Sequence, residues 1–114
     1  MKICVITSTR ADFGLLQSLM QRIAESPSLE LQIVATGAHL LEEFGSTSVD
    51  IQAAGFSIDW EVRELTEANE GLEVAHQVGQ GISGFTAAFD SLKPDLVVIV
   101  GDRYEMLSAA IPAF

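Results

Sequence analysis

The stretch that decides the fold is residues 94–105, which read PDLVVIVGDRYE. A proline opens it, an uninterrupted apolar run fills 96–100, and Gly101-Asp102 ends that run. An all-apolar run of this length is typical of a parallel strand buried on both faces of its sheet. We therefore expect a strand at 95–100 and a helix that begins near Arg103.

Outward from this stretch, strand patterns alternate with helix patterns along the whole chain. β-branched and apolar runs predict strands at 3–7 and 29–35. Alternating apolar and polar residues at 56–62 predict a half-exposed strand near a sheet edge. The segment 63–70 is polar and is expected to be a mobile loop. The predicted helices are one that ends before Pro27 and carries Leu15, Leu16, Leu19, Met20 and Ile23 on one face, short ones at 40–44 and 49–54, and a long one at 71–92.

This alternation predicts an α/β fold, with right-handed crossovers, a parallel sheet and helices on both of its faces. In the strand order 3-2-1-4, the carboxyl ends of the first and fourth strands lie side by side, where such sheets bind ligands. Two loops, 7–12 and 101–105, follow those ends. The chain has the length of one domain, 1–114, and its last helix is not followed by a further strand. We expect it to be the amino-terminal part of a larger fold whose carboxy-terminal domain lies outside it.

Composition excludes several classes of function. The formal net charge is −10, with only six lysines and arginines, which disfavours binding to nucleic acid or to an anionic membrane. The longest apolar run is far shorter than the roughly 20 residues of a membrane span, and the amino terminus does not resemble a signal peptide. We expect a cytoplasmic protein. Cys4 lies inside an apolar run and is interpreted as a small buried hydrophobe. The pattern of histidines and cysteines predicts no metal site, and no cofactor is predicted.

The first candidate loop contains neither a dinucleotide-binding nor a P-loop glycine motif. It offers hydroxyl groups at 7–9, followed by Arg10 at the start of a helix. Backbone N–H groups at a helix start, together with a guanidinium group, suit a phosphate or a uracil. The alternative is structural: Thr9 or Asp12 caps the helix, and Arg10 is a solvated surface residue.

The second candidate loop contains Asp102 at the end of the most apolar strand. Asp102 with Glu105 three residues later also fits a capping box, so both side chains could be structural. Arg103 in the first helical turn opposes the helix dipole, and an anion nearby would offset that. Both interpretations of Asp102 stay open from spacing alone, whereas Glu105 is assigned to capping.

The remaining candidates are weaker. His39 follows the second strand and is interpreted as a hydrogen-bonding loop residue rather than a catalyst, and His76 as an ordinary helix residue. Glycines at 79, 81 and 84 lie within the long predicted helix, where each costs up to about 1 kcal/mol. They indicate close approach of another helix, of a partner subunit or of a ligand.

Three segments of the chain carry a resemblance to a known family. They read VITSTRADFGLL at 5–16, TGAHL at 36–40 with EFG at 43–45, and LKPDLVVIVGDRYEML at 92–107. Together they resemble the amino-terminal part of UDP-N-acetylglucosamine 2-epimerases. The forms RADF and GDRYE are similar to the hydrolysing branch, used in making sialic acid and related sugars, rather than to the RPE and GDT forms of the non-hydrolysing branch.

The resemblance implies the amino-terminal Rossmann-like domain of a glycosyltransferase-B-type fold, with a UDP-sugar bound between two domains. The implied reaction eliminates UDP and adds water, giving UDP and N-acetylmannosamine or a related 2-epimeric sugar. Arg10 matches a family arginine near UDP, Asp102 the essential aspartate in an acid/base or orienting role, and Arg103 a UDP-contacting arginine. Other catalytic residues are expected beyond Phe114, so this chain alone is expected to be inactive. A homo-oligomer is expected.

Three other functions remain as alternatives. Two of them are enzymes, a non-hydrolysing 2-epimerase and a glycosyltransferase of the same two-domain type. The third is a non-catalytic flavodoxin-like binding module. A phospho-acceptor domain would need clustered carboxylates at the strand ends, whereas the first strand ends in hydroxyl groups and an arginine.

Overall fold

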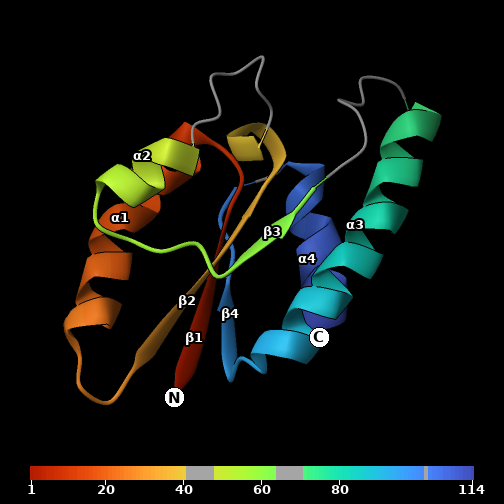
Figure 1. The fold of residues 1–114 in the computed structure, drawn as a ribbon. Coiled ribbons are helices and arrows are strands. Elements are labelled where there is room, and N and C mark those ends of the chain that lie inside the picture. Colours follow the sequence, from red (N-terminus) through yellow and green to blue (C-terminus); the bar gives the residue numbers. More distant parts are fainter. Residues whose placement is uncertain (41–47, 64–70, 102) are drawn as a thin grey trace.

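The computed structural model describes residues 1–40, 48–63, 71–101 and 103–114. Within these residues, four parallel strands form one sheet in the order β3-β2-β1-β4, as predicted (Figure 1). The elements in chain order are β1 Lys2–Thr7, α1 Arg10–Glu25, β2 Glu30–Thr36, the 3-10 helix η1 Gly37–Leu40, α2 Ser48–Ala53, β3 Trp60–Val62, α3 Gly71–Leu92, β4 Leu96–Val98 and α4 Tyr104–Ala113.

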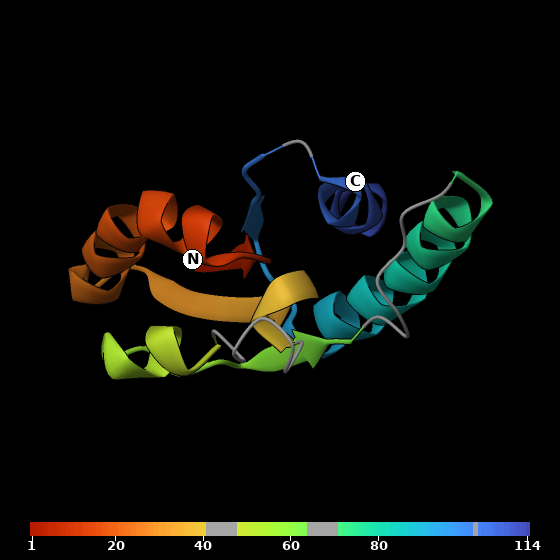
Figure 2. The same ribbon diagram turned by 90° about the horizontal axis from the view of Figure 1, so that it is seen from above.

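Helices cover both faces of the sheet, with α1 and α2 on one face and α3 and α4 on the other (Figure 2). Alternation along β1 supplies both cores, because successive side chains of a strand point to opposite faces. Ile3 and Val5 belong to the cluster under α1 and α2, which also contains Phe13, Leu16, Met20, Ile23, Ile33, Ala35 and Ile51. Cys4 and Ile6 belong to the cluster under α3 and α4, which also contains Val34, Val62, Phe85, Ala88, Met106 and Ala109.

The core face of α1 differs from the prediction in two positions. Leu16, Met20 and Ile23 are buried as expected, but Leu15 and Leu19 are exposed, and Phe13 completes the buried stripe. With 3.6 residues per turn, positions 13, 16, 20 and 23 share one face, and the residue before each is rotated about 100° away. The helix ends at Glu25, before Pro27, as predicted.

Both edge strands are shorter than predicted. β3 spans only Trp60–Val62 of the predicted 56–62, although Asp59 joins β2 just before it through two hydrogen bonds with the backbone of Ile33, of 2.8 and 2.9 Å. β4 spans only Leu96–Val98, and the prediction that it is buried on both faces is wrong: Leu96 is half exposed. β4 lies at the edge of the described sheet, where β1 is its neighbour on one side. The described residues therefore cover this strand less completely than they cover the central strands.

The remaining helices follow the predictions closely. The long helix α3 has the predicted bounds, 71–92, and α2 lies where the short helix at 49–54 was expected. Most of the predicted helix at 40–44 and of the predicted loop at 63–70 lies outside the described residues. None of the described helices combines the length and the apolarity that crossing a membrane requires.

Of the glycines at 79, 81 and 84, two explain how α3 packs. A Cβ atom at Gly81 would lie 2.7 Å from Ser108 of α4, and one at Gly84 would lie 2.7 Å from Val62 of β3. The predicted close approach is therefore confirmed for these two glycines, and a helix and a strand of the same chain make it. Around Gly79 a Cβ atom would meet no described atom within 4 Å, so the described chain makes no close approach there.

Candidate functional site

The turn after β1 is organised by the side chain of Asp12. Its carboxylate accepts hydrogen bonds from the Ser8 hydroxyl at 2.6 Å, the Thr9 backbone N–H at 3.2 Å and the Ser8 backbone N–H at 3.3 Å. The Thr9 hydroxyl in turn accepts from the Asp12 backbone N–H at 3.1 Å, which completes a capping box at the start of α1. The structural interpretation of Thr9 and Asp12 is therefore confirmed, and it gives the turn one fixed conformation.

The loop after β4 reaches this turn, as the predicted strand order requires. Gly101 has a positive φ of 98°, and a Cβ atom there would lie 3.7 Å from Oδ1 of Asp12. The two loops that the sequence singled out are thus adjacent at the carboxyl edge of the sheet. Asp102, the candidate catalytic residue, lies outside the described residues.

Arg10 is the first residue of α1, and its side chain is exposed. Its Nε atom lies 2.9 Å from Oδ2 of Asp50 in α2, so the guanidinium joins two helices at this edge. An exposed ion pair of this kind contributes little to stability, and the guanidinium remains accessible to a ligand. The predicted contact of Arg10 with UDP stays a prediction.

Arg103 and Glu105 form an ion pair at the start of α4. Arg103 is the N-cap of the helix, and its guanidinium donates from Nε and Nη2 to the Glu105 carboxylate at distances of 3.0 to 3.3 Å. The side chain of Glu105 is 1% exposed, whereas that of Arg103 is 47% exposed. The hydrogen bonds that its guanidinium donates to Glu105 raise the pKa of Arg103 above its ordinary value, although partial burial opposes this.

This geometry corrects the assignment of Glu105 to a capping box with Asp102. The N-cap position belongs to Arg103, one residue later than predicted, and it makes no side-chain capping hydrogen bond. Glu105 is consequently the second helical residue, and its carboxylate binds a guanidinium. Spacing could not reveal this contact, because residues two apart do not face each other on a helix. They meet here since Arg103 has an extended backbone, with ψ at 154°.

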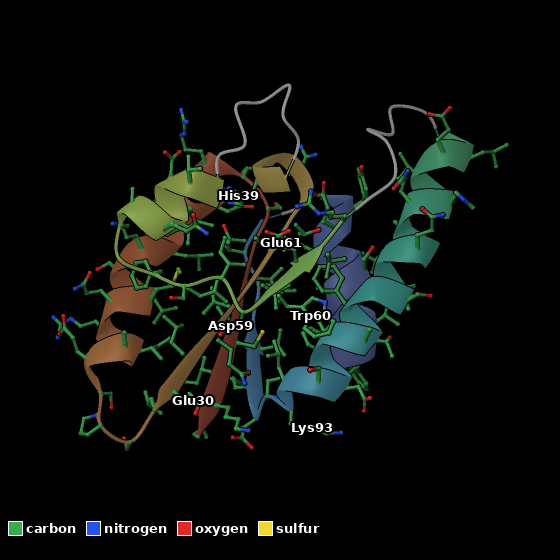
Figure 3. The ribbon with its side chains drawn as sticks, in the orientation of Figure 1. Glu30, His39, Asp59, Trp60, Glu61 and Lys93 are labelled. Carbon is green, nitrogen blue, oxygen red and sulfur yellow. The ribbon has the colours of Figure 1, made fainter. Side chains whose placement is uncertain are left out.

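His39 is buried beneath the same edge of the sheet. Its Nε2 atom lies 2.8 Å from the Thr7 hydroxyl, and its backbone N–H donates to the Ser8 carbonyl at 3.0 Å. Figure 3 shows His39 at the end of the sheet opposite Glu30 and Lys93. The interpretation of His39 as a hydrogen-bonding residue is confirmed, and its position ties η1 to the end of β1. The sequence did not indicate that this histidine is buried.

Burial makes the thiol of Cys4 inert, in agreement with the sequence analysis. The side chain is fully buried and forms no disulfide. Burial, followed by the negative charge of Asp59, raises the pKa of Cys4 to about 12, so the thiol is protonated at neutral pH and is a poor nucleophile. Within the described residues, no group of three or more histidine, cysteine, aspartate or glutamate side chains could hold a metal ion.

The described edge therefore combines a rigid turn, two accessible guanidinium groups and a buried polar layer. The polar residues of this layer lie at or just after the strand ends, in η1 and at the start of α4, and each is fully or almost fully buried: Thr7, Ser8, Thr36, His39 and Glu105. Guanidinium groups at helix starts suit the binding of a phosphate-bearing ligand.

The chain is similar to known proteins along almost its whole length. The family model for UDP-N-acetylglucosamine 2-epimerase matches residues 21–114. The chain is 44% identical over 109 residues to a GDP/UDP-N,N'-diacetylbacillosamine 2-epimerase (hydrolyzing) of Campylobacter jejuni, which covers 96% of this chain and 28% of that protein. It is 41% identical over 113 residues to the UDP-N,N'-diacetylbacillosamine 2-epimerase (hydrolyzing) of Legionella pneumophila, covering 98% of this chain and 30% of that protein. The chain thus spans less than a third of the length of these relatives.

The fold is also that of solved structures. A UDP-GlcNAc 2-epimerase from Neisseria meningitidis, crystallised with UDP-GlcNAc, superimposes with a TM-score of 0.81 at 17% identity, over 99% of this chain and 29% of that one. The family match over most of the chain, the identity to two hydrolysing enzymes and the shared fold lead to one conclusion. The chain belongs to the UDP-N-acetylglucosamine 2-epimerase family.

Proposed function

We propose that residues 1–114 form the amino-terminal Rossmann-like domain of a hydrolysing UDP-sugar 2-epimerase. The observation that carries this proposal is the 44% identity to a hydrolysing 2-epimerase across 96% of the chain. The adjacency of the turn after β1 and the loop after β4 supports it, since both belong to the edge at which parallel sheets bind ligands. The rest of the enzyme, including its second domain, lies outside these residues.

In the proposed reaction, the enzyme eliminates UDP from the sugar to give a 2-acetamidoglucal. Water then adds to this intermediate, and the products are UDP and the free 2-epimeric sugar. The substrate is a UDP-linked 2-acetamido sugar, either UDP-N-acetylglucosamine or the diacetamido sugar named for the two relatives of highest identity given above. We further propose that the enzyme is a cytoplasmic homo-oligomer.

Three residues have proposed roles at the UDP-sugar. Arg10 and Arg103 bind the UDP portion, since each carries an accessible guanidinium at the start of a helix that faces this edge. Asp102 is proposed to take part in proton transfer or to orient the substrate. Glu105 is excluded from direct contact with the substrate, because its side chain is 1% exposed.

Product analysis with the full-length protein tests the proposal. The protein is incubated separately with UDP-N-acetylglucosamine and with its diacetamido counterpart, and proton NMR follows the anomeric and H2 signals. We expect free UDP and a free 2-epimeric sugar in equal amounts from one of the two. A 2-epimer still linked to UDP would instead identify a non-hydrolysing enzyme, a glycoside formed with an added acceptor would identify a glycosyltransferase, and failure to bind or convert either sugar would contradict the proposal.

A further inference from the structure

The Glu105 carboxylate lies close to Gly37 as well as to Arg103. A Cβ atom on Gly37, the first residue of η1, would lie 3.3 Å from Oε1 of Glu105 and 3.1 Å from Cβ of Ser8. Gly37 itself has a positive φ of 60°, a backbone conformation that residues other than glycine rarely adopt. The absence of a side chain at this position therefore leaves room for the carboxylate where it pairs with Arg103.

Unlike the buried Glu105, Arg103 is partly exposed to solvent. Its Nε and Nη2 atoms are engaged by Glu105, and in the described part of the chain no hydrogen bond involves Nη1. The side chain is half exposed, and the charges that raise its pKa include that of Asp12 in the neighbouring turn. Glu105 thus binds Nε and Nη2, while the half-exposed guanidinium remains accessible to a ligand.

We propose that Glu105 is a positioning residue: it holds the Arg103 guanidinium in the orientation that binds the diphosphate of the UDP-sugar, without contacting the ligand itself. This inference rests on the proposed function, because the anion is the diphosphate of that substrate. A long arginine side chain otherwise loses rotational freedom when it binds an anion. A carboxylate that has already ordered the side chain removes that cost from ligand binding.

Glu105 could affect UDP binding in two opposing ways, so the direction of the change in UDP affinity tests the proposal. A buried negative charge next to Arg103 also lowers the positive potential that attracts a diphosphate. If neutralisation dominated, replacing Glu105 by an uncharged residue would strengthen UDP binding. If positioning dominates, the same replacement weakens it.

Glu105→Gln in the full-length protein separates the two effects, since glutamine keeps the size of the side chain and removes its charge. We expect KM for the UDP-sugar and Kd for UDP to rise roughly 3- to 10-fold, the ordering cost of one long side chain, with kcat nearly unchanged. Glu61→Gln is the matched control, because Glu61 pairs with Arg63 at 2.6 Å on the surface; both constants should stay at the wild-type values. An unchanged or lower Kd in Glu105→Gln would overturn the proposal.

A double-mutant cycle tests whether Glu105 acts through Arg103. Once Arg103→Ala has been made, adding Glu105→Gln should leave Kd for UDP within about twofold. Full additivity of the two changes would overturn the proposal, since Glu105 would then act by another route. Circular dichroism identifies a temperature at which every variant is folded.

A second variant disturbs Glu105 without changing any charge. Gly37→Ala places a methyl group against the carboxylate and against Ser8, so it should raise Kd for UDP in the same direction as Glu105→Gln. Gly55→Ala is the control, because Gly55 also has a positive φ, of 93°, but a methyl group there meets no described atom within 4 Å. Equal effects of the two alanines on Kd would overturn the proposal by assigning the loss to backbone strain.

These outcomes separate the inference from the proposed function. A wild-type protein that neither binds UDP nor converts a UDP-sugar would overturn both. Wild-type turnover combined with an unaltered Kd in Glu105→Gln would overturn only the role of Glu105. The NMR signal of the Arg103 Nε–H group adds a measure without substrate: we expect slow exchange with water in the wild type and fast exchange in Glu105→Gln, and equal rates would contradict the proposed ordering.

Discussion

Asp12 joins the end of β1 to the start of α1 through a single carboxylate. It accepts hydrogen bonds from the Ser8 hydroxyl and from the backbone of Ser8 and Thr9, and its backbone N–H donates to the Thr9 hydroxyl. Gly101, in the loop after β4, lies beside the same carboxylate. A change at Asp12 therefore alters the shape of the turn that presents Arg10.

Asp12→Ala should destabilise the protein by about 1–3 kcal/mol. The substitution removes the capping box and leaves the Ser8 and Thr9 donors without their acceptor. Urea denaturation measures the change, and Asp90→Ala provides a control, because the described contact of Asp90 is an exposed pair with Lys93. Equal stability of the two variants would show that the Asp12 contacts contribute nothing beyond those of a surface carboxylate.

Asp102→Asn tests the residue proposed for catalysis. Asparagine is nearly equal in size to aspartate but cannot exchange a proton at neutral pH. In the full-length protein we expect kcat to fall roughly 10²- to 10⁴-fold, the range for a lost general acid or base, while the melting temperature stays close to wild type. Arg10→Ala should instead raise KM with little change in kcat, as expected for lost binding to UDP. Initial rates on both variants measure this, and a fully active Asp102→Asn enzyme would return Asp102 to a structural role.

At the level of elements, α3 packs closely on α4 because Gly81 has no side chain. The Ser108 hydroxyl of α4 donates to the Val78 carbonyl at 3.2 Å, and Gly81 lies against the same serine. α4 begins with the Arg103–Glu105 pair, so the position of this helix also sets the position of that pair. Close contact between α3 and α4 thus connects one face of the sheet to the candidate site.

Two glycine substitutions in α3 should change the stability of the protein in opposite directions. Gly81→Ala places a methyl group 2.7 Å from Ser108, and overpacking of this kind costs about 1–3 kcal/mol. Gly79→Ala meets no described atom within 4 Å, so it should stabilise the helix by up to about 1 kcal/mol. Thermal unfolding of both variants measures the difference. Stabilisation by Gly81→Ala would mean that α4 moves away at no cost.

At the level of the whole molecule, the described sheet presents its candidate site on one edge only. The turn after β1, η1 and the start of α4 all lie at the carboxyl ends of the strands (Figure 1). The other end of the sheet holds the amino-terminal contacts, where Lys2 and Asp95 join β1 to β4 through two hydrogen bonds of 2.7 and 2.9 Å. In the proposed function, the described residues supply one wall for a ligand bound between two domains.

The isolated chain 1–114 should not release UDP from UDP-N-acetylglucosamine or from the diacetamido sugar. Catalysis requires groups positioned on both sides of the substrate, and this chain corresponds to less than a third of its relatives. A coupled assay for UDP measures the rate, with the full-length protein as the positive control. Turnover by the purified chain, free of the longer enzyme, would contradict the half-site interpretation.

The strand order, and with it the position of both loops at one end of the sheet, was predicted from the common arrangement of such folds. Local patterns in the sequence determined the alternation of strands with helices and the bounds of α3. These follow from periodicity, which depends on the chain alone. The end of α1 before Pro27 was predictable for the same reason. The resemblance carried by the segments 5–16, 36–40 and 92–107 identified the family that the comparisons then established.

Tertiary structure alone decided which apolar residues are buried and what Glu105 does. Leu15, Leu19 and Leu96 are apolar, yet they are exposed because the described chain offers no neighbour on their side. Glu105 is charged, yet it is buried, with its carboxylate beside Gly37 of η1 and paired with Arg103. Burial depends on contacts between distant segments, and the Arg103–Glu105 pair depends on the backbone conformation at Arg103, so no pattern of residue spacing specifies either.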